Sequence, residues 1–335
     1  MTNIPRPDTT RLQNMARAYT QTAVLWAAID LGLFTAVSQG ATDEDAVAEA
    51  CGVSRLDAER LVVCCLTLDL LRVENGKLVN PPDVERFMVK GQRGYAGPWM
   101  TFTRRDVPKW FEISELMTNG PEPGLLGMYE DLTVDRARKY HEATYSIGMG
   151  AGRRFVRTVD LSGRKRMLDL GGGSGAYSIN VVQAHEDMTA VVFDLPPVVE
   201  VTREFLEENG VGDRVDTVGG DFTSDPLPED CDVVVMASNL PIYDADVIAG
   251  VVARAHDALR PGGEMHLVGE MLADDRTAPA DAAMWGMNEL LYAGMGRAHT
   301  IAECIGYFEG AGFTDVGVTE FVPGTLERVH GVKAV

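Results

Sequence analysis

Cysteine is scarce in this chain of 335 residues, and its spacing is irregular. The number is odd, and the positions lack the paired spacing of zinc ligands. We therefore expect reduced thiols in a cytoplasmic protein, with no metal site. The five cysteines are Cys51, Cys64, Cys65, Cys231 and Cys304.

Long apolar runs and export signals are also lacking. The N-terminus has no basic segment that leads into an apolar core, and the most apolar early stretch, residues 22–37, is interrupted by Asp30. A membrane-spanning helix needs about 20 predominantly apolar residues. We therefore expect neither a secretion signal nor a membrane span.

Positive charge is in short supply. The chain has 30 Lys and Arg residues against 50 Asp and Glu residues, which leaves a formal charge of −20. Such a surface repels phosphate backbones and anionic lipids, so nucleic acid and membranes are excluded as expected partners. Because 45% of the residues are hydrophobic, the chain has enough apolar material for two domain cores.

A glycine-rich stretch organises the second half of the chain. An apolar run at residues 166–170 leads into Gly171-Gly172-Gly173-Ser174-Gly175, and a helix-compatible segment follows. This order predicts a buried strand, a tight turn and a helix N-terminus. Glycine permits positive φ and close approach of a ligand, and free N–H groups at a helix start favour an electron-rich partner. The stretch therefore predicts a nucleotide cradle.

The strands expected next end on residues that suit a nucleotide. Residues 190–193 end on Asp194, about 20 residues beyond the turn, where a carboxylate can accept ribose hydroxyls. Residues 215–218 lead to Asp221 and Phe222, an acid and a ring suited to adenine. Because the turn also satisfies G-x-G-x-x-A, an NAD-dependent oxidoreductase remains an alternative.

Five motifs in this order resemble those of S-adenosylmethionine-dependent class I methyltransferases. The similarity is to the small-molecule O-methyltransferases that include acetylserotonin, caffeate and polyketide enzymes, and it covers nearly the whole chain. It implies an α/β fold with a doubly wound Rossmann-like sheet, an N-terminal all-helical winged-helix-like dimerisation domain, and a homodimer. The motifs span residues 168–175, 193–196, 220–222, 260–263 and 311–313.

The resemblance implies three regions. Residues 1–95 form the winged-helix-like dimerisation domain, residues 96–162 a helical linker that roofs the acceptor pocket, and residues 163–335 the catalytic domain. A loop is expected at Pro121-Glu122-Pro123-Gly124, and an antiparallel strand pair at residues 313–321 and 328–335.

Local patterns support the first region. Residues 10–39 predict a helix with a broad apolar stripe, and Ser54 predicts the N-cap of a helix that runs through Leu71. Asn75-Gly76 predicts a hairpin. Helix, turn, helix and hairpin also occur in DNA-binding proteins, but the candidate recognition helix carries as many acids as bases, so the basic footprint is missing.

The resemblance also assigns cofactor contacts. It implies that Asp169 and the glycines hold the methionine part of S-adenosylmethionine, that Asp194 binds the ribose, and that Asp221 and Phe222 frame adenine. The expected set is Asp169, Gly171, Gly172, Gly173, Gly175, Asp194, Leu195, Asp221, Phe222, Ser238 and Asn239.

The residue that should act as base is missing. Methyl transfer to a hydroxyl needs in-line alignment and a group that removes the proton. Most family members carry a His after the fourth strand, and here Pro241 occupies that position in Leu240-Pro241-Ile242-Tyr243-Asp244. Three explanations remain open: another base (His299, His141, Glu270 or Tyr243), catalysis by proximity alone, or an acceptor without a proton to lose.

A thioether is such an acceptor, because its sulfur becomes a sulfonium directly. We therefore favour S-methylation of a small-molecule thioether acid such as 4-methylthio-2-hydroxybutyrate, on the route to dimethylsulfoniopropionate. The alternatives are O-methylation of a phenol or other hydroxyl, C-methylation, and a non-catalytic cofactor-binding protein. The acceptor's carboxylate needs a cation and hydrogen-bonding groups. The candidate acceptor and catalytic residues are Tyr140, His141, Tyr145, Arg297, His299 and Glu270.

Overall fold

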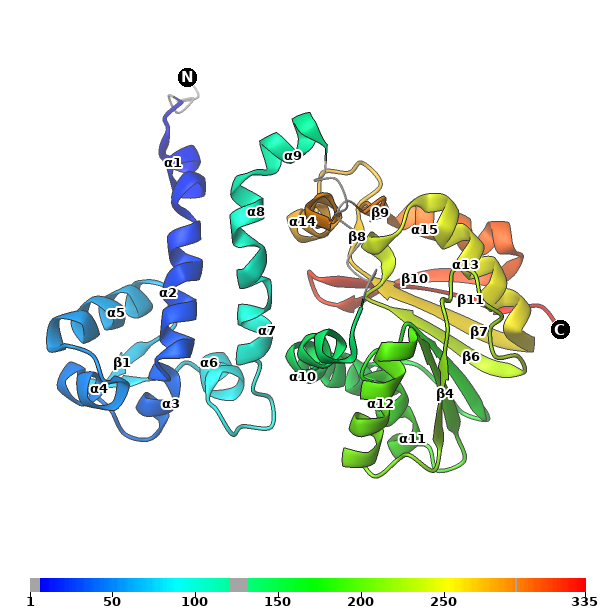
Figure 1. Ribbon diagram of the computed structural model, residues 1–335, viewed down its shortest axis with the longest axis horizontal. Helices are drawn as coiled ribbons and strands as arrows, with labels where there is room; N and C mark the ends of the chain where they lie inside the picture. Colours follow the sequence, from blue (N-terminus) through cyan, green and yellow to red (C-terminus); the bar gives the residue numbers. More distant parts are fainter. Residues whose placement is uncertain (1–6, 121–131, 293) are drawn as a thin grey trace, which may run out of the picture. The chain divides into compact units, whose positions relative to one another are not determined.

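The computed structural model describes residues 7–120, 132–292 and 294–335. The chain divides into two compact units, Met1–Thr103 and Arg104–Val335, each with its own apolar core (Figure 1). The expected loop at residues 121–124 lies outside the described residues. Within the described part of the chain, no helix has the length and apolarity needed to cross a membrane.

The first unit consists of short helices and one hairpin. Strands β1 (Arg72–Glu74) and β2 (Lys77–Val79) pair antiparallel around Asn75 and Gly76, which both have positive φ, so the predicted hairpin is confirmed. The Ser54 side chain caps α5 by accepting from the backbone N–H of Asp57, as predicted. The helices are α1 (Thr10–Arg17), α2 (Tyr19–Asp30), α3 (Leu33–Ser38), α4 (Glu44–Cys51), α5 (Arg55–Thr67), α6 (Pro82–Met88) and α7 (Gly97–Thr101).

Two helix predictions in this unit had wrong boundaries. The helix expected over residues 10–39 is broken into α1, α2 and α3, and Gly32 takes a left-handed conformation with φ of 71° between the last two. The helix expected to reach Leu71 ends at Thr67. The backbone N–H groups of Leu70 and Leu71 both donate to the Cys65 carbonyl, which turns the chain away from the helix axis.

The second unit contains a seven-stranded sheet in the order β10-β11-β7-β6-β3-β4-β5. The last five strands of this order run parallel, while β10 and β11 are antiparallel at one edge, which confirms the doubly wound sheet and the predicted terminal strand pair. The strands are β3 (Arg166–Leu170), β4 (Thr189–Asp194), β5 (Val215–Gly219), β6 (Cys231–Ala237), β7 (Leu259–Gly269), β10 (Phe313–Val322) and β11 (Leu326–Lys333).

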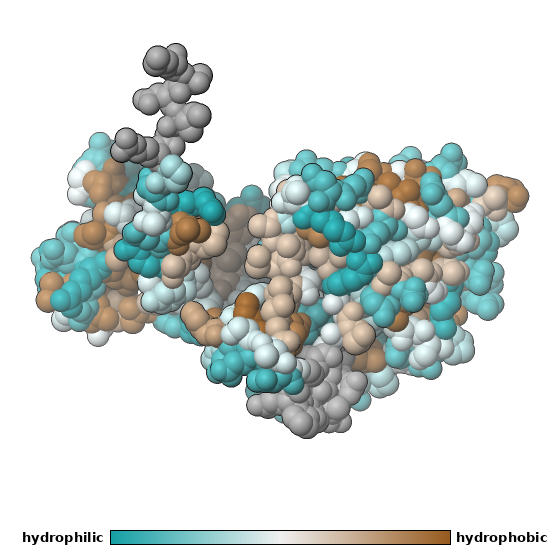
Figure 2. All heavy atoms as spheres, turned by 90° about the horizontal axis from the view of Figure 1, so that it is seen from above, coloured by the Kyte–Doolittle hydropathy of each residue, from teal (hydrophilic) through white to brown (hydrophobic). Residues whose placement is uncertain are grey.

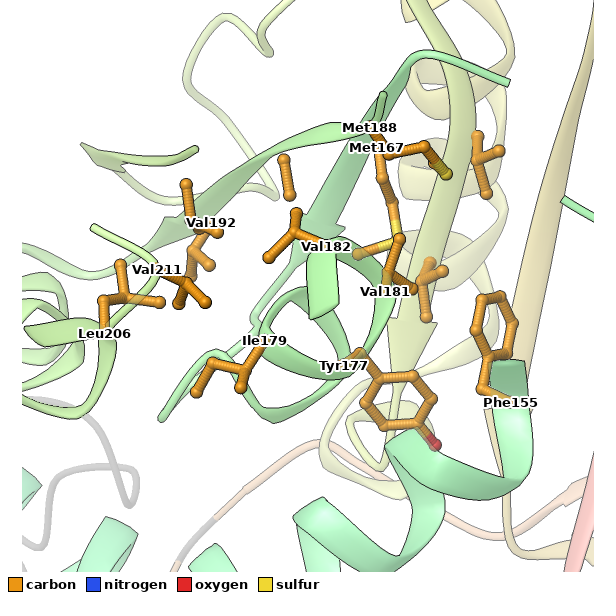
Figure 3. Packing of buried hydrophobic residues seen from close by; sticks show 14 of the residues in the cluster. Phe155, Met167, Tyr177, Ile179, Val181, Val182, Met188, Val192, Leu206 and Val211 are labelled. Atoms are coloured by element: carbon orange, nitrogen blue, oxygen red, sulfur yellow. The ribbon is translucent and has the colours of Figure 1, made fainter. Parts of the chain in front are cut away.

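Helices cover both faces of this sheet (Figure 1). Met167 of β3 packs into the core with α10, α11 and α12, shown in Figure 3, and the next residue, Leu168, packs into the core with α13 and α15. A strand buried on both faces needs this near-continuous apolar sequence. The α-helices described in the second unit are α8 (Val107–Phe111), α9 (Ile113–Asn119), α10 (Val134–Thr158), α11 (Ala176–Ala184), α12 (Pro196–Glu208), α13 (Ala245–Ala258), α14 (Ala280–Asn288) and α15 (Ile301–Ala311).

Shorter elements complete the fold. A parallel pair, β8 (Met271–Leu272) with β9 (His299–Thr300), extends beyond the end of β7. The chain runs from β3 outward to β5 and then returns to β6, so the strand order reverses between β3 and β6. Ligands of doubly wound sheets bind at the carboxyl ends of the strands at such a reversal. The 3-10 helices are η1 (Phe102–Asp106), η2 (Leu240–Ile242) and η3 (Glu289–Tyr292).

Candidate active site

The glycine turn links the end of β3 to the start of α11. Gly171 and Gly173 have φ values of 62° and 56°, which favour glycine. A Cβ on Gly171 would stand 2.6 Å from Nδ2 of Asn239, and one on Gly173 would stand 2.6 Å from Cε1 of His141. Both positions therefore require glycine for space as well as for conformation.

Asp169 supports this turn from beneath. Its carboxylate Oδ2 accepts from the Ser178 hydroxyl at 2.8 Å and from the Ser178 backbone N–H at 3.3 Å. Burial raises the pKa of Asp169 to about 6, although the bonds from Ser178 oppose the shift. A Cβ on Gly172 would stand 2.6 Å from the Asp169 carboxyl carbon, so the side chain packs directly against the turn.

Asp194 lies on the neighbouring strand, at the end of β4. Its Oδ2 accepts from the Gly173 backbone N–H at 2.8 Å, and its Oδ1 accepts from the Leu195 N–H at 2.7 Å. Burial raises the pKa of Asp194 to about 6 despite these two bonds. Each carboxylate oxygen has a further lone pair, which can accept a hydroxyl of a bound diol.

Phe222 and Asn239 approach the turn from the two sides. The Phe222 ring is buried 3.0 Å from the position of a Cβ on Gly171 and meets the ring of Tyr243 edge-on at 5.5 Å. The Asn239 amide donates to the carbonyls of Leu170 and Gly171 at 3.4 and 3.3 Å. Phe222, Asn239 and Asp194 thus all meet the same turn.

Two members of the expected set serve local structure. Asp221 accepts from the backbone N–H and the hydroxyl of Thr223 at 2.8 and 2.7 Å, so one of its oxygens already holds a turn. Ser238 has a φ of 61° and donates its N–H to the Val268 carbonyl at 2.9 Å. This bond places Ser238 between β6 and β7 at the carboxyl edge of the sheet.

The acceptor candidates on α10 do not share one environment. The His141 ring lies against Gly173, and Tyr140 meets it edge-on at 5.1 Å. Burial lowers the pKa of His141 to about 4, so the ring is neutral at neutral pH. Tyr145 instead stacks on Phe205 of α12 at 4.6 Å, and its hydroxyl accepts from the Asn209 amide at 2.7 Å. The structure therefore brings His141 to the glycine turn, with Tyr140 against its ring, and it engages Tyr145 elsewhere.

Arg297 and His299 are held by other protein groups. Arg297 contacts Oε1 of Glu303 at 2.9 Å, which raises the pKa of Arg297 and compensates its charge. His299 is fully buried, with Nδ1 2.9 Å from the Tyr307 hydroxyl and Nε2 2.9 Å from the Tyr243 carbonyl. Both ring nitrogens of His299 are therefore engaged, whereas the Arg297 guanidinium has five N–H donors and is held by Glu303 through one nitrogen.

Glu270 follows β7 and has an environment suited to proton exchange. Burial raises the pKa of Glu270 to about 7, with a smaller contribution from Asp281. Its charge acts on the buried hydroxyl of Tyr177, whose pKa is raised by burial, Asp169 and Glu270. In Figure 3 the Tyr177 ring lies beside Phe155 at the margin of the apolar cluster.

Our sequence-based prediction missed one buried acid, Glu289. It is the first residue of η3 and only 5% exposed, and burial raises its pKa to about 7. The sequence does carry a signal, because Glu289 is an acid in the otherwise mostly apolar stretch from Ala282 to Tyr292. Charged residues are rarely fully buried without a partner, so such a position merits attention.

The fold and the site define a nucleotide-binding α/β enzyme, and the comparisons identify its family. The family of O-methyltransferase domains matches residues 128–314. The chain is 32% identical to 3-hydroxy-5-methyl-1-naphthoate 3-O-methyltransferase of Streptomyces sahachiroi, over 97% of this chain and 95% of that protein. The chain therefore belongs to the O-methyltransferase family and is an S-adenosylmethionine-dependent methyltransferase.

Two further proteins agree with this assignment. The tetracenomycin polyketide synthesis 8-O-methyl transferase of Streptomyces glaucescens is 28% identical, with 91% of each chain covered. Human N-acetylserotonin methyltransferase, solved in complex with S-adenosylmethionine, shares the fold with a TM-score of 0.81 at 22% identity, and both chains are covered completely. By their names, the two Streptomyces relatives transfer the methyl group to oxygen, so they give no support to the thioether acceptor that we expected.

The residues at the turn fit this cofactor. Gly171 and Gly173 leave the space that side chains would occupy, and Asp194 presents a carboxylate that can accept hydroxyls. Phe222 adds an apolar ring beside the same turn. An adenosine with a charged amino acid tail needs backbone N–H donors, a carboxylate that accepts the ribose hydroxyls and an apolar surface for the base. The turn and its neighbours offer all three.

Proposed function

We propose that this protein methylates a hydroxyl group on a small aromatic molecule. The observation that supports this best is the naphthoate O-methyltransferase relative, which is 32% identical over 97% of this chain. This proposal takes the place of the thioether acceptor that we favoured from the absence of a His at Pro241. When bound, S-adenosylmethionine supplies an electrophilic methyl group carried on a sulfonium.

The cofactor roles follow from the contacts at the carboxyl edge of the sheet. We assign ribose binding to Asp194, because the Gly173 and Leu195 N–H groups fix its two oxygens beside the turn. Phe222 packs against the adenosine, and the Asn239 amide keeps the ends of β3 and β6 together. Asp169 acts from beneath, by bracing the turn through Ser178.

We place the acceptor next to α14 and η2. This placement rests on the family resemblance and on the exposed apolar side chains Met284 and Met287 of α14. Apolar side chains with a few polar groups are typical of small-molecule sites. His141 lies beside the glycine turn with Tyr140 against its ring, and together they form a further wall, with the neutral His141 as a polar contact.

We also propose that the first unit is a winged-helix-like dimerisation domain, as the resemblance implies. None of the residues of α1 is buried, and the side chains of Leu12 and Met15 are 55% and 66% exposed. Apolar residues, drawn brown in Figure 2, reach the surface of this unit. Exposed apolar side chains on one helix favour burial against a second copy of the chain.

The proposed function is tested by the choice of acceptor. Wild-type protein is supplied with S-adenosylmethionine and one acceptor at a time, and release of S-adenosylhomocysteine is measured. Hydroxynaphthoates and simple phenols are compared with 4-methylthio-2-hydroxybutyrate. We expect turnover of aromatic hydroxyls, and turnover of the thioether alone would refute the proposal.

A further inference from the structure

A hydroxyl acceptor needs a group that takes its proton, and few described side chains at this edge of the sheet can do so. Pro241 cannot, and His299 has both ring nitrogens within hydrogen-bonding distance of protein oxygens. His141 binds protons weakly because burial lowers its pKa to about 4. Asp169 and Asp194 are engaged at the glycine turn, so among the described buried acids with a raised pKa we consider Glu270 and Glu289.

The backbone of Glu289 is hydrogen-bonded, whereas its carboxylate has no hydrogen-bond or ion-pair partner among the residues that the structure describes. The backbone carbonyl of Glu289 accepts from the Gly294 N–H at 3.0 Å. Oε2 stands 2.6 Å from the position that a Cβ on Gly294 would take, so the carboxylate in its present position packs against this glycine. Among the described residues, none donates a hydrogen bond to this carboxylate or forms an ion pair with it.

Tyr243 connects this acid to the cofactor side of the site. Burial raises the pKa of Tyr243, and the charges of Asp221, Asp194 and Glu289 raise it further, so the Tyr243 hydroxyl lies within electrostatic range of all three acids. The Tyr243 ring also meets Phe222 edge-on at 5.5 Å. The charge of Glu289 therefore acts on the same tyrosine hydroxyl as the charge of Asp194, the carboxylate that we assign to the ribose.

The chain that follows Glu289 approaches η2. Gly296 is so close to Pro241 and Ile242 that a Cβ on Gly296 would collide with their backbone atoms. Nε2 of His299 lies 2.9 Å from the Tyr243 carbonyl, which ties the chain after η3 to the chain after η2. The chain that follows Glu289 is therefore held against the segment that lacks a base, and within the described residues the Glu289 carboxylate has no partner.

We infer that Glu289 is the general base that takes the proton from the acceptor hydroxyl. The inference rests on the proposed hydroxyl acceptor. A carboxylate oxygen of Glu289 accepts the proton while the freed electron pair on the acceptor oxygen forms the bond to the methyl carbon. The pair of the breaking carbon–sulfur bond stays on sulfur. The products are a methyl ether, S-adenosylhomocysteine and a protonated Glu289, which returns its proton to solvent.

The surroundings of Glu289 suit a base that works near neutral pH. Burial raises its pKa to about 7 from the ordinary value of 4.5. The ionisable groups around η3 include Tyr243, Lys109, Tyr292, Asp106 and Arg105: Nζ of Lys109 contacts the Leu291 carbonyl at 2.9 Å, and Asp106 and Arg105 act on the Tyr292 hydroxyl. The Lys109 ammonium thus donates to a backbone carbonyl of η3, and no ion pair between it and Glu289 is found among the described residues.

The test compares wild-type protein with Glu289→Gln on two aromatic acceptors. One has an ordinary phenolic hydroxyl, and the other carries electron-withdrawing groups, so that its hydroxyl is already ionised at neutral pH. We expect kcat/KM for the first to fall by about 10²- to 10⁴-fold, the usual contribution of a general base, and that for the second to change little. For the ordinary phenol, kcat/KM of the wild-type protein should also rise with pH through about pH 7, and this rise should be absent in Glu289→Gln.

Two control variants make the comparison specific. Glu327→Gln removes a carboxyl whose pKa is also raised by partial burial, but on strand β11, and it should leave methylation of both acceptors unaffected. Glu270→Gln removes the competing acid. Loss of the limb near pH 7 in Glu270→Gln and its survival in Glu289→Gln would overturn the inference, as would an equal loss with both acceptors in Glu289→Gln.

The outcomes distinguish a failure of the Glu289 assignment from a failure of the proposed hydroxyl methylation. If the wild-type protein methylates no aromatic hydroxyl, the proposed function fails. If it methylates phenols and Glu289→Gln does so equally well, only the base assignment fails. Should Glu289→Gln not fold, Glu289→Asp keeps the charge and withdraws it by one methylene, so we expect a smaller loss that is still confined to the less acidic acceptor. An unselective loss in Glu289→Asp would contradict the assignment.

Discussion

The backbone N–H of Gly173 donates to Oδ2 of Asp194 at 2.8 Å, although 21 residues separate the two positions. This bond joins the glycine turn after β3 to the end of β4, and it sets the orientation of the carboxylate that we assign to the ribose. Cofactor binding should therefore depend on Asp194 for the carboxylate and on Gly173 for the orientation of that carboxylate.

Replacement of the acid tests its role directly. Asp194→Asn retains one oxygen and the side-chain shape, but it removes the charge and one acceptor. Charge-assisted hydrogen bonds contribute about 1.5–3 kcal/mol, so we expect S-adenosylhomocysteine to bind about 10- to 100-fold more weakly by calorimetry. Asp216→Asn, an exposed position on β5, is the matched control and should bind normally.

The pH dependence of cofactor binding follows from the same residue. The pKa of Asp194 is raised to about 6 in the free protein, and only the ionised form offers both oxygens as acceptors. Affinity for S-adenosylhomocysteine should therefore rise as the pH increases toward 6, by up to about tenfold per unit, and then level off. Calorimetry between pH 5 and 8 measures this. An affinity that is flat across this range in the wild-type protein would contradict the assignment.

Substitution of the turn glycine tests the close approach of His141. Gly173→Ala introduces left-handed strain of about 1–2 kcal/mol and, in addition, a Cβ 2.6 Å from the imidazole. Gly210→Ala is a matched control, because φ is 65° there and no atom lies within 4 Å of the added carbon. In denaturant unfolding, we expect Gly173→Ala to be more destabilising than Gly210→Ala. Equal losses would mean that His141 moves away freely.

We expect His299 to stabilise the fold and to take no part in proton transfer. Its ring is fully buried between the Tyr307 hydroxyl and the Tyr243 carbonyl. Tyr307→Phe removes one partner and should lower the free energy of unfolding by about 1–3 kcal/mol, because a buried ring nitrogen loses its bond. The limb of the pH profile near 7 should remain. Loss of that limb in Tyr307→Phe would instead assign proton transfer to His299.

The dimer proposal makes a prediction about mass in solution. Sedimentation of the wild-type protein should give twice the mass of one chain. Leu12→Asp places a charge in the exposed apolar face of α1 and should yield monomers, whereas Leu56→Asp, at an exposed leucine of α5 in the same unit, should not. A monomeric wild-type protein would refute the proposal.

The sequence was sufficient to predict the sheet and the glycine turn at its carboxyl edge. Gly171, Gly173 and Asp194 are recognisable because a strand, a glycine turn and an acid at the next strand end follow from local patterns and from the parallel-sheet rule. The sequence placed Asn239 at the edge of the fourth strand, and the structure adds that its amide donates to the Leu170 and Gly171 carbonyls.

The acceptor side could not be predicted in the same way, because its side chains are engaged over long sequence distances. His299 contacts the Tyr243 carbonyl 56 residues away, and Tyr145 contacts Asn209 64 residues away. No local pattern encodes these pairs. Glu289 was overlooked because a single acid in an apolar stretch has no periodicity, and its burial depends on the packing of η3.

The most direct test of the account is the identity of the atom that receives the methyl group. Wild-type protein is incubated with S-adenosylmethionine labelled with ¹³C on its methyl group and with a hydroxynaphthoate, and the product is examined by NMR. We predict a labelled carbon bonded to the aromatic oxygen. A label found on ring carbon, or turnover confined to a thioether acceptor with the label on sulfur, would contradict the account.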